Sequence, residues 1–174
     1  MTESLRERLR ALPDFPEILP EFDVAAAPEN PQDLFLLWLE EALAIGSANA
    51  HTFSLSTATS DGKASGRMLI LKDLDSRGWH FATSCTSRKG RELTATPWAA
   101  MTFYWPEHGR QIRLAGPVSE LSAEESAADW DARPGTTGDV NVNWRVYALQ
   151  PTEIEFWQAS HDRRHIRHRY EPRG

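Results

Sequence analysis

The chain has 174 residues, 40% hydrophobic and 25% charged, which is typical of a single globular domain. Its formal net charge of −6 argues against general binding to nucleic acids, and its single cysteine, Cys85, excludes an intramolecular disulfide and any multi-cysteine metal site. The N-terminus has no apolar stretch of the kind found in secretory signals, and no apolar run approaches the length that spans a bilayer. We therefore expect a cytoplasmic protein with neither nucleic acid nor membrane as a partner.

Charge is unevenly distributed along the chain. Residues 1–45 contain ten acidic and three basic residues, whereas residues 161–173 contain five arginines and three histidines against two acids. A basic end on an acidic chain indicates either a local anion site or a solvated charged tail.

The first regular element follows a proline-containing segment. Residues 1–29 include four prolines and show little periodicity, so we interpret them as an N-terminal arm. Asn30-Pro31 resembles an N-cap followed by proline at the first helical position, and Gly46 suits a C-terminal end. Apolar residues at helical spacing between them predict a helix over residues 31–45. Residues 30–174 are expected to form one domain.

The pattern then changes to strands joined by short turns. We expect strands over residues 51–59, 64–72, 79–83, 98–105 and 110–121, with one or two more within residues 144–157. Two helices interrupt them: residues 88–95, which Pro97 ends, and a helix that starts at the Ser122–Glu125 capping box and reaches Asp131. Several strands at short spacing with few helices favour a mainly β fold, a closed or partly closed antiparallel barrel.

Arg67 and Lys72 lie at the two ends of one apolar strand. Because side chains alternate along a strand, a separation of five places the two cations on opposite faces, where they would serve two different groups. The alternative is that both are strand-end charges in solvent.

A second basic group stands at the start of the short helix 88–95. Free backbone N–H groups, the helix dipole and the adjacent side chains of Arg88 and Lys89 together favour a phosphate site. Thr83 and Ser87 add hydroxyl donors just upstream. The alternative is a plain capped surface helix with basic residues.

The third group is the basic end of the chain, which follows Trp157. The indole of Trp157 is suited to stacking on a planar ring. Alternation would place Arg163, His165, Arg167 and Arg169 on one side of an extended segment, where they would repel one another unless an anion lay among them. The alternatives are a disordered basic tail and a tail that binds RNA.

Other chemistries find little support. The histidines of the tail are not part of a zinc motif, and their arginine neighbours disfavour a cation, so no metal is expected. The sequence has neither the GxSxG of serine hydrolases nor a GxGxxG or Walker loop. Any phosphate-bearing ligand must therefore be held by side chains and turn amides.

Seven short stretches, taken together, resemble the pyridoxamine 5′-phosphate oxidase family. They are RMLILK (67–72), SRKGREL (87–93), FYWP (103–106), QIR (111–113), ARP (132–134), IEFWQ (154–158) and RRHIR (163–167). The stretches occur in the order of the family and span residues 30–134 and 144–170. The resemblance implies a split antiparallel β-barrel with a few peripheral helices, assembled as a homodimer with FMN at the subunit interface.

The resemblance also assigns roles to single residues. It implies that Arg67, Arg88 and Lys89 bind the phosphate of FMN and that Gln111 contacts its isoalloxazine or ribityl region. Arg163 and His165 would be catalytic, orienting the substrate and assisting proton removal. The full implied sets are Arg67, Met68, Leu69, Ile70, Leu71, Lys72, Thr83, Ser87, Arg88, Lys89, Gln111, Trp157 and Arg167 for the cofactor, and Lys72, Arg133, Arg163 and His165 for the substrate.

The activity implied by the resemblance is that of an FMN-dependent oxidase acting on a small molecule. Pyridoxamine or pyridoxine 5′-phosphate would be oxidised to pyridoxal 5′-phosphate by hydride transfer from its C4′ carbon to the flavin. Dioxygen would reoxidise the flavin and leave as hydrogen peroxide.

Several features depart from the family pattern. Residues 135–143 are too short for a segment that usually carries a further helix and a Gln-Ser pair touching FMN, and the sequence ends at Gly174, where the family generally adds a last strand. Ala82 replaces a usual aromatic residue. Asp129 stands where a tyrosine for the substrate phosphate is usual, and an acid there would repel a phosphate unless its charge were neutralised.

Trp130 and the Pro97-Trp98 pair resemble instead the sister oxidases of phenazine biosynthesis. Lys72 and Arg133 argue for a phosphorylated substrate, whereas Asp129 and the short loop argue against one. Two alternatives therefore remain: a sister FMN oxidase of a specialised metabolite, and a flavin-binding protein with little oxidase activity.

Overall fold

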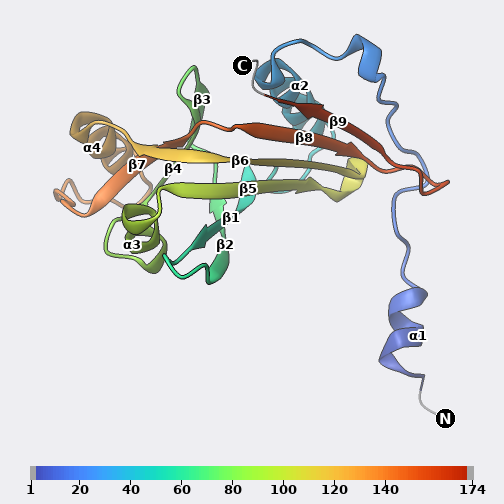
Figure 1. The fold of residues 1–174 in the computed structure, drawn as a ribbon, viewed down its shortest axis with the longest axis horizontal. Coiled ribbons are helices and arrows are strands. Elements are labelled where there is room, and N and C mark those ends of the chain that lie inside the picture. Colours follow the sequence, from blue (N-terminus) through green and yellow to red (C-terminus); the bar gives the residue numbers. More distant parts are fainter. Residues whose placement is uncertain (1–2, 172–174) are drawn as a thin grey trace.

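The computed structural model describes residues 3–171, which form a curled antiparallel sheet with helices at its edges (Figure 1). The helices are α1 (Leu5–Arg10), α2 (Pro31–Ala44), α3 (Arg88–Ala95) and α4 (Ala123–Asp131), with short 3₁₀ turns at Val24–Ala26 and Pro106–His108. The strands are β1 (Thr52–Ala58), β2 (Ala64–Ile70), β3 (Asp73–Asp75), β4 (Gly78–Ser84), β5 (Trp98–Trp105), β6 (Arg110–Glu120), β7 (Trp144–Leu149), β8 (Glu153–Gln158) and β9 (Ile166–Tyr170).

The long strand β6 is the point at which the sheet divides. The strand order is β2-β1-β5-β6-β7-β4-β3, and β8 and β9 form a second branch on β6. The first half of β6 pairs with β8 from Arg110 to Ala115, and its last residues pair with β7 from Val118. Gly116 lies at the division, where a Cβ would come within 2.3 Å of the carbonyl oxygen of Gln150. The 150–152 turn can cross β6 because this residue has no side chain.

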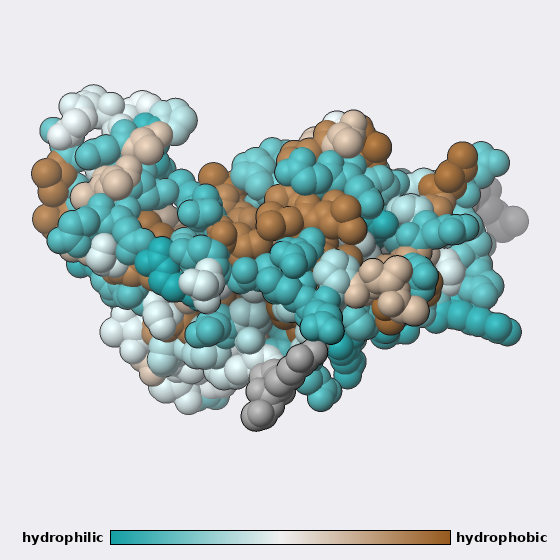
Figure 2. Space-filling model, turned by 90° about the horizontal axis from the view of Figure 1, so that it is seen from above, coloured by the Kyte–Doolittle hydropathy of each residue, from teal (hydrophilic) through white to brown (hydrophobic). Residues whose placement is uncertain are grey.

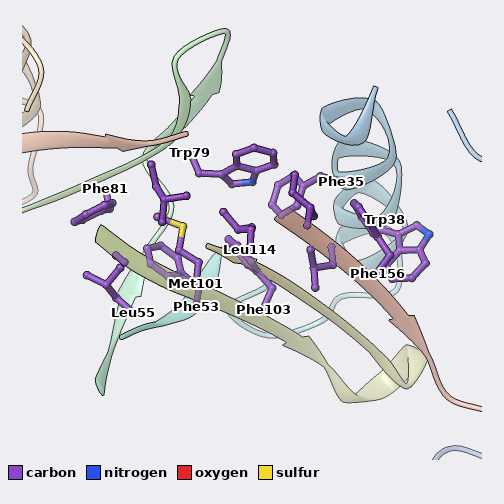
Figure 3. Packing of buried hydrophobic residues seen from close by; sticks show 14 of the residues in the cluster. Phe35, Trp38, Phe53, Leu55, Trp79, Phe81, Met101, Phe103, Leu114 and Phe156 are labelled. Atoms are coloured by element: carbon purple, nitrogen blue, oxygen red, sulfur yellow. The ribbon is translucent and has the colours of Figure 1, made fainter. Parts of the chain in front are cut away.

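The core is rich in aromatic rings and lies between α2 and the inner face of the sheet (Figure 3). Phe35 on α2 contacts Trp79 on β4 and Phe103 on β5 edge-to-face, with ring centroids 5.6 and 5.0 Å apart. Trp38, one turn further along α2, meets Phe156 of β8 at 5.2 Å. α2 therefore contacts both branches of the sheet.

Most elements predicted from the sequence are confirmed. α2 begins after Asn30, whose side chain accepts a hydrogen bond from the N–H of Gln32. α3 has the predicted bounds, and α4 follows the predicted capping box, in which Ser122 and Glu125 satisfy each other's backbone N–H groups. The mainly β architecture with a half-barrel of antiparallel strands is likewise confirmed.

The basic end of the chain differs from the prediction. It contains strand β9, which pairs with β8 and places Arg167 opposite Trp157. Arg163 and His165 precede this strand with positive φ angles of 61° and 37°. Such a left-handed turn breaks the alternation of side chains, so the prediction that four basic residues share one side of an extended segment is wrong.

No helix within residues 3–171 is long and apolar enough to cross a membrane. Seen from above, the surface is mostly hydrophilic, with apolar residues exposed between the polar ones (Figure 2). The exposed apolar side chains of β2 are Met68 and Ile70, which point away from the core.

Candidate functional site

Arg67 is anchored beside α3 by its strand neighbours. Its guanidinium donates to the hydroxyls of Thr57 and Ser65 at 2.6 and 2.7 Å and to the carbonyl of Leu55 at 3.2 Å. One of its nitrogens also lies 3.6 Å from a carboxylate oxygen of Glu92 on α3. Arg67, which is predicted to bind a phosphate, is therefore held in a fixed position before any phosphate binds.

Glu92 is a buried carboxylate that the sequence reasoning missed. It accepts hydrogen bonds from Thr57, from Ser65 at 2.9 Å and from Arg88 at 2.9 Å. The hydrogen bond from Thr57, followed by those from Arg88 and Ser65, lowers the pKa of Glu92 to about 2. The spacing of four between Arg88 and Glu92 was the one available signal, since such residues are neighbours on a helix.

Lys89 completes what we call the basic corner, made of Arg67, Arg88, Lys89 and Glu92. Burial, and then the nearby charge of Arg67, lower the pKa of the Lys89 ammonium. Within residues 3–171 no acidic side chain forms an ion pair with Lys89. The carboxylate of Glu92 forms ion pairs with Arg67 and Arg88 instead. The corner therefore has an excess of positive charge, which suits an anionic group.

The backbone before α3 shapes the same corner. Ser87 caps the helix, accepting from the N–H of Gly90 at 3.2 Å, and its hydroxyl lies 3.4 Å from that of Thr83. A Cβ on Gly90 would lie 2.5 Å from the carbonyl oxygen of Ser84. Glycine therefore lets α3 pack closely on the 84–85 backbone, with its N-terminus beside the cationic side chains.

Acid titration tests the role of Glu92. Its pKa is depressed from 4.5 to about 2, so the stability gained from its ionised form is complete above about pH 4.5 and is lost as the pH falls towards 2. We expect the free energy of unfolding, measured with denaturant at several pH values, to fall less steeply across this window in Glu92→Gln than in the unaltered protein.

The control is Glu124→Gln, since Glu124 is an exposed residue of α4. This variant should keep the original slope. Parallel pH profiles for Glu92→Gln and the unaltered protein would show that the buried carboxylate is not ionised in the way its hydrogen bonds require.

A second group of predicted residues gathers around α4. We call Lys72, Asp129, Trp130, Arg133 and Trp144 the α4 cluster. The ammonium of Lys72 lies 3.2 Å from one carboxylate oxygen of Asp129, and the indole N–H of Trp144 donates to the other at 2.8 Å. The guanidinium of Arg133 lies over both indoles, 4.9 Å from the ring of Trp130 and 4.3 Å from that of Trp144. Lys72 and Arg67 thus have different partners. Strand β2 ends at Ile70, so Lys72 lies beyond the strand whose alternation was expected to place the two cations on opposite faces.

The third group lies around Trp157. Register places Gln111 beside Trp157 and Trp157 beside Arg167 on three neighbouring strands. The ring of His165 lies 4.7 Å from that of Trp157, and its Nδ1 accepts from the backbone N–H of Ser160 at 3.1 Å. We call Gln111, Trp157, Arg163, His165 and Arg167 the Trp157 group.

The N-terminal segment covers part of the Trp157 group. Phe15 lies against Trp157 and His165, with ring centroids 6.0 and 5.9 Å apart, and Asp14 forms an ion pair with Arg163. These contacts join residues far apart in the chain, and no local pattern predicts them.

A single chain does not bring all the predicted site residues together. The basic corner and the α4 cluster lie towards one end of the sheet, around α3 and α4, whereas β9 and the end of β8 lie at the other (Figure 1). The side chains of Leu69 and Leu71 pack against the core. Any contact of these two residues with a ligand would therefore be made by their backbone groups. A site that uses all these residues requires a second chain.

Comparisons with known proteins identify the family to which the chain is similar. Residues 39–158 match the family described as "Pyridoxamine 5'-phosphate oxidase", and residues 144–174 match "Pyridoxine 5'-phosphate oxidase C-terminal dimerisation region". Among curated relatives, a pyridoxine/pyridoxamine 5′-phosphate oxidase of Bordetella avium is 35% identical over 85% of this chain and 86% of its own length. One from Gloeothece citriformis is 34% identical over 82% of this chain and 83% of its own length.

Two solved structures resemble the fold. PhzG from Burkholderia lata 383, in complex with tetrahydrophenazine-1-carboxylic acid, is 32% identical, with a TM-score of 0.84 over 93% of this chain and 95% of that one. A pyridoxamine 5′-phosphate oxidase-related FMN-binding protein from Nostoc punctiforme is 16% identical, with a TM-score of 0.59 over 86% of this chain and 100% of that one. The second likeness concerns the fold alone.

Proposed function

Because this chain belongs to the pyridoxamine 5′-phosphate oxidase family, a family of FMN-dependent oxidoreductases, we propose that it oxidises a small molecule with bound FMN. The resemblance inferred from the seven sequence stretches is confirmed by the family match. The observation that carries the proposal is the basic corner, where Lys89 lies beside Arg67 and has no acidic partner of its own among residues 3–171.

The match of residues 144–174 to a dimerisation region supports a homodimer. We infer that the basic corner of one protomer faces the Trp157 group of its partner. A two-fold axis makes such an interface self-complementary, so one contact would complete two sites. The opposite positions of these two groups in one chain support this arrangement.

The residues present fit FMN. Arg67, Arg88 and Lys89 would bind its phosphate through charge-assisted hydrogen bonds, with Thr83 and Ser87 as hydroxyl donors. From the partner protomer, the Trp157 group would supply a planar indole for stacking and the amide of Gln111 for a hydrogen bond. Bound FMN would supply the redox chemistry of the reaction, which is hydride abstraction from the substrate with dioxygen as the final oxidant.

Arg163 and His165 would act on the substrate. Since Nδ1 of His165 accepts a hydrogen bond from Ser160, the neutral ring carries its proton on Nε2. The Nε2–H group is available to donate a hydrogen bond to a substrate atom. Arg163 would exchange its ion pair with Asp14 for a contact with the substrate. Both residues would position the reacting carbon.

Two substrate classes are supported by different observations. The names of the curated relatives favour pyridoxamine or pyridoxine 5′-phosphate, with Lys72 and Arg133 among the substrate ligands. The likeness to PhzG, together with the Lys72–Asp129 ion pair, favours a sister oxidase of a specialised metabolite such as a partly reduced phenazine acid. A flavin-binding protein with little oxidase activity is the third alternative.

The test begins with flavin. The purified protein should be yellow and should release FMN on denaturation, identified by chromatography against FAD and riboflavin. Peroxide formed from pyridoxamine 5′-phosphate, pyridoxine 5′-phosphate or reduced phenazine acids would then identify the substrate class. A protein that neither retains nor takes up FMN would refute the proposal, and FMN without peroxide from any of them would favour the third alternative.

A further inference from the structure

We propose that Asp129 determines substrate specificity, closing the Lys72–Arg133 end of the substrate site to doubly charged phosphate groups. The end is then suited to a planar substrate that carries at most one negative charge there. The inference rests on the proposed function for the position of the substrate, and it concerns the charge that the site accepts.

Both oxygens of the Asp129 carboxylate are already engaged. Oδ1 lies 3.2 Å from the ammonium of Lys72, and Oδ2 accepts the indole N–H of Trp144 at 2.8 Å. The side chains of Lys72 and Asp129 are 23% and 18% exposed, so the ion pair is largely shielded from water. A carboxylate held by two partners in such surroundings is a fixed part of the site.

Arg133, the second predicted phosphate ligand, is also occupied. Its guanidinium lies over the rings of Trp130 and Trp144, at 4.9 and 4.3 Å from their centroids. Trp144 therefore links both cations, since it stacks on Arg133 and donates to Asp129, the partner of Lys72. A phosphate bound by both cations would therefore lie beside the carboxylate of Asp129.

The charges decide what the site accepts. Lys72 and Arg133 supply two positive charges, and Asp129 offsets one of them. A phosphate monoester brings a charge of about −1.5 to −2 near pH 7. Placed against Lys72 it would meet the carboxylate of Asp129, and like charges in a shielded site disfavour the ionised form of both. A single carboxylate or a neutral polar group matches the remaining positive charge.

Removing this charge should open the site to phosphate. In Asp129→Asn the amide oxygen can still accept the indole N–H of Trp144, while Lys72 loses its counter-ion. The matched control is Asp131→Asn, the same loss of charge two residues further along α4 at an exposed position. The probes are 4-deoxypyridoxine and its 5′-phosphate, which differ in the phosphate and lack the C4′ hydroxyl that would be oxidised.

The measurement is equilibrium dialysis of each probe against the FMN-loaded protein, with flavin content determined on the same samples. We expect the unaltered protein and Asp131→Asn to bind the two probes within about threefold of each other, and Asp129→Asn to bind the phosphate ester at least about tenfold more tightly than the unaltered protein does. Affinity for the unphosphorylated probe should change less than about twofold.

Two results would overturn the inference. One is a strong preference of the unaltered protein for the phosphate ester that Asp129→Asn leaves unchanged or weakens. The other is no gain in phosphate-ester binding in Asp129→Asn, including equal changes for both probes with a lower melting temperature, which is the result of a purely structural role. Absence of FMN from every sample would instead refute the proposed function, and the flavin content measured on the same samples distinguishes this outcome from the other two.

Discussion

Replacing Lys89 with alanine is expected to weaken FMN binding by about 1–3 kcal/mol, or about 5- to 150-fold in the dissociation constant. Within residues 3–171, Lys89 is the member of the basic corner without an acidic partner, and burial beside Arg67 already disfavours its charge in the free protein. A phosphate would relieve that cost, so the loss of Lys89 removes an interaction that the ligand alone provides.

The measurement is titration of flavin-free protein with FMN, followed by the quenching of flavin fluorescence. Lys63→Ala is the matched control, since Lys63 is 78% exposed and pairs with Asp61 in the turn between β1 and β2. It should bind FMN as the unaltered protein does. Equal affinities of Lys89→Ala and Lys63→Ala for FMN would place the phosphate elsewhere.

Replacing Arg163 with alanine is expected to lower turnover about 10- to 100-fold while FMN affinity stays within about twofold. Arg163 is 70% exposed, and its ion pair with Asp14 can be exchanged for a contact with the substrate. A side chain that orients the reacting carbon affects the transition state, whereas the proposed flavin ligands are other residues.

Steady-state peroxide formation and flavin titration on the same preparations separate the two effects. Arg164→Ala is the control, because the neighbouring Arg164 is 90% exposed and its guanidinium lies 3.8 Å from Asp162. It should retain full turnover. If Arg163→Ala loses its flavin, the residue belongs to the cofactor site and our division of roles is mistaken.

Local signals predicted the elements that carry the basic corner. Ser87 caps α3 and Pro97 follows its end, so both bounds could be read from neighbouring residues. Strand β9 lacked such signals, because its charged residues resemble a solvated tail as much as an edge strand. Its backbone is paired by β8, which tertiary folding brings alongside.

The pairing of distant charges could not be predicted in the same way. Asp129 was recognised as a departure from the family pattern that would repel a phosphate unless neutralised. The neutralising residue is Lys72, 57 positions earlier in the chain, and the structure alone shows them in contact. Glu92 likewise accepts hydrogen bonds from residues distant in the sequence, Thr57 on β1 and Ser65 on β2. The alternation of side chains along a strand predicts the face on which a charged residue lies, but it does not predict which residue it contacts.

Strand β6 aligns the strands at both ends of the molecule. It pairs with β5 along one edge and with β8 and then β7 along the other. A slip of one residue in this strand would turn its own inward side chains outward and change its pairing with all three neighbours at once. Gln111 beside Trp157, and the β7 strand that carries Trp144, would then be displaced together. The distance between the Trp157 group and the α4 cluster is thus set by the register of a single strand.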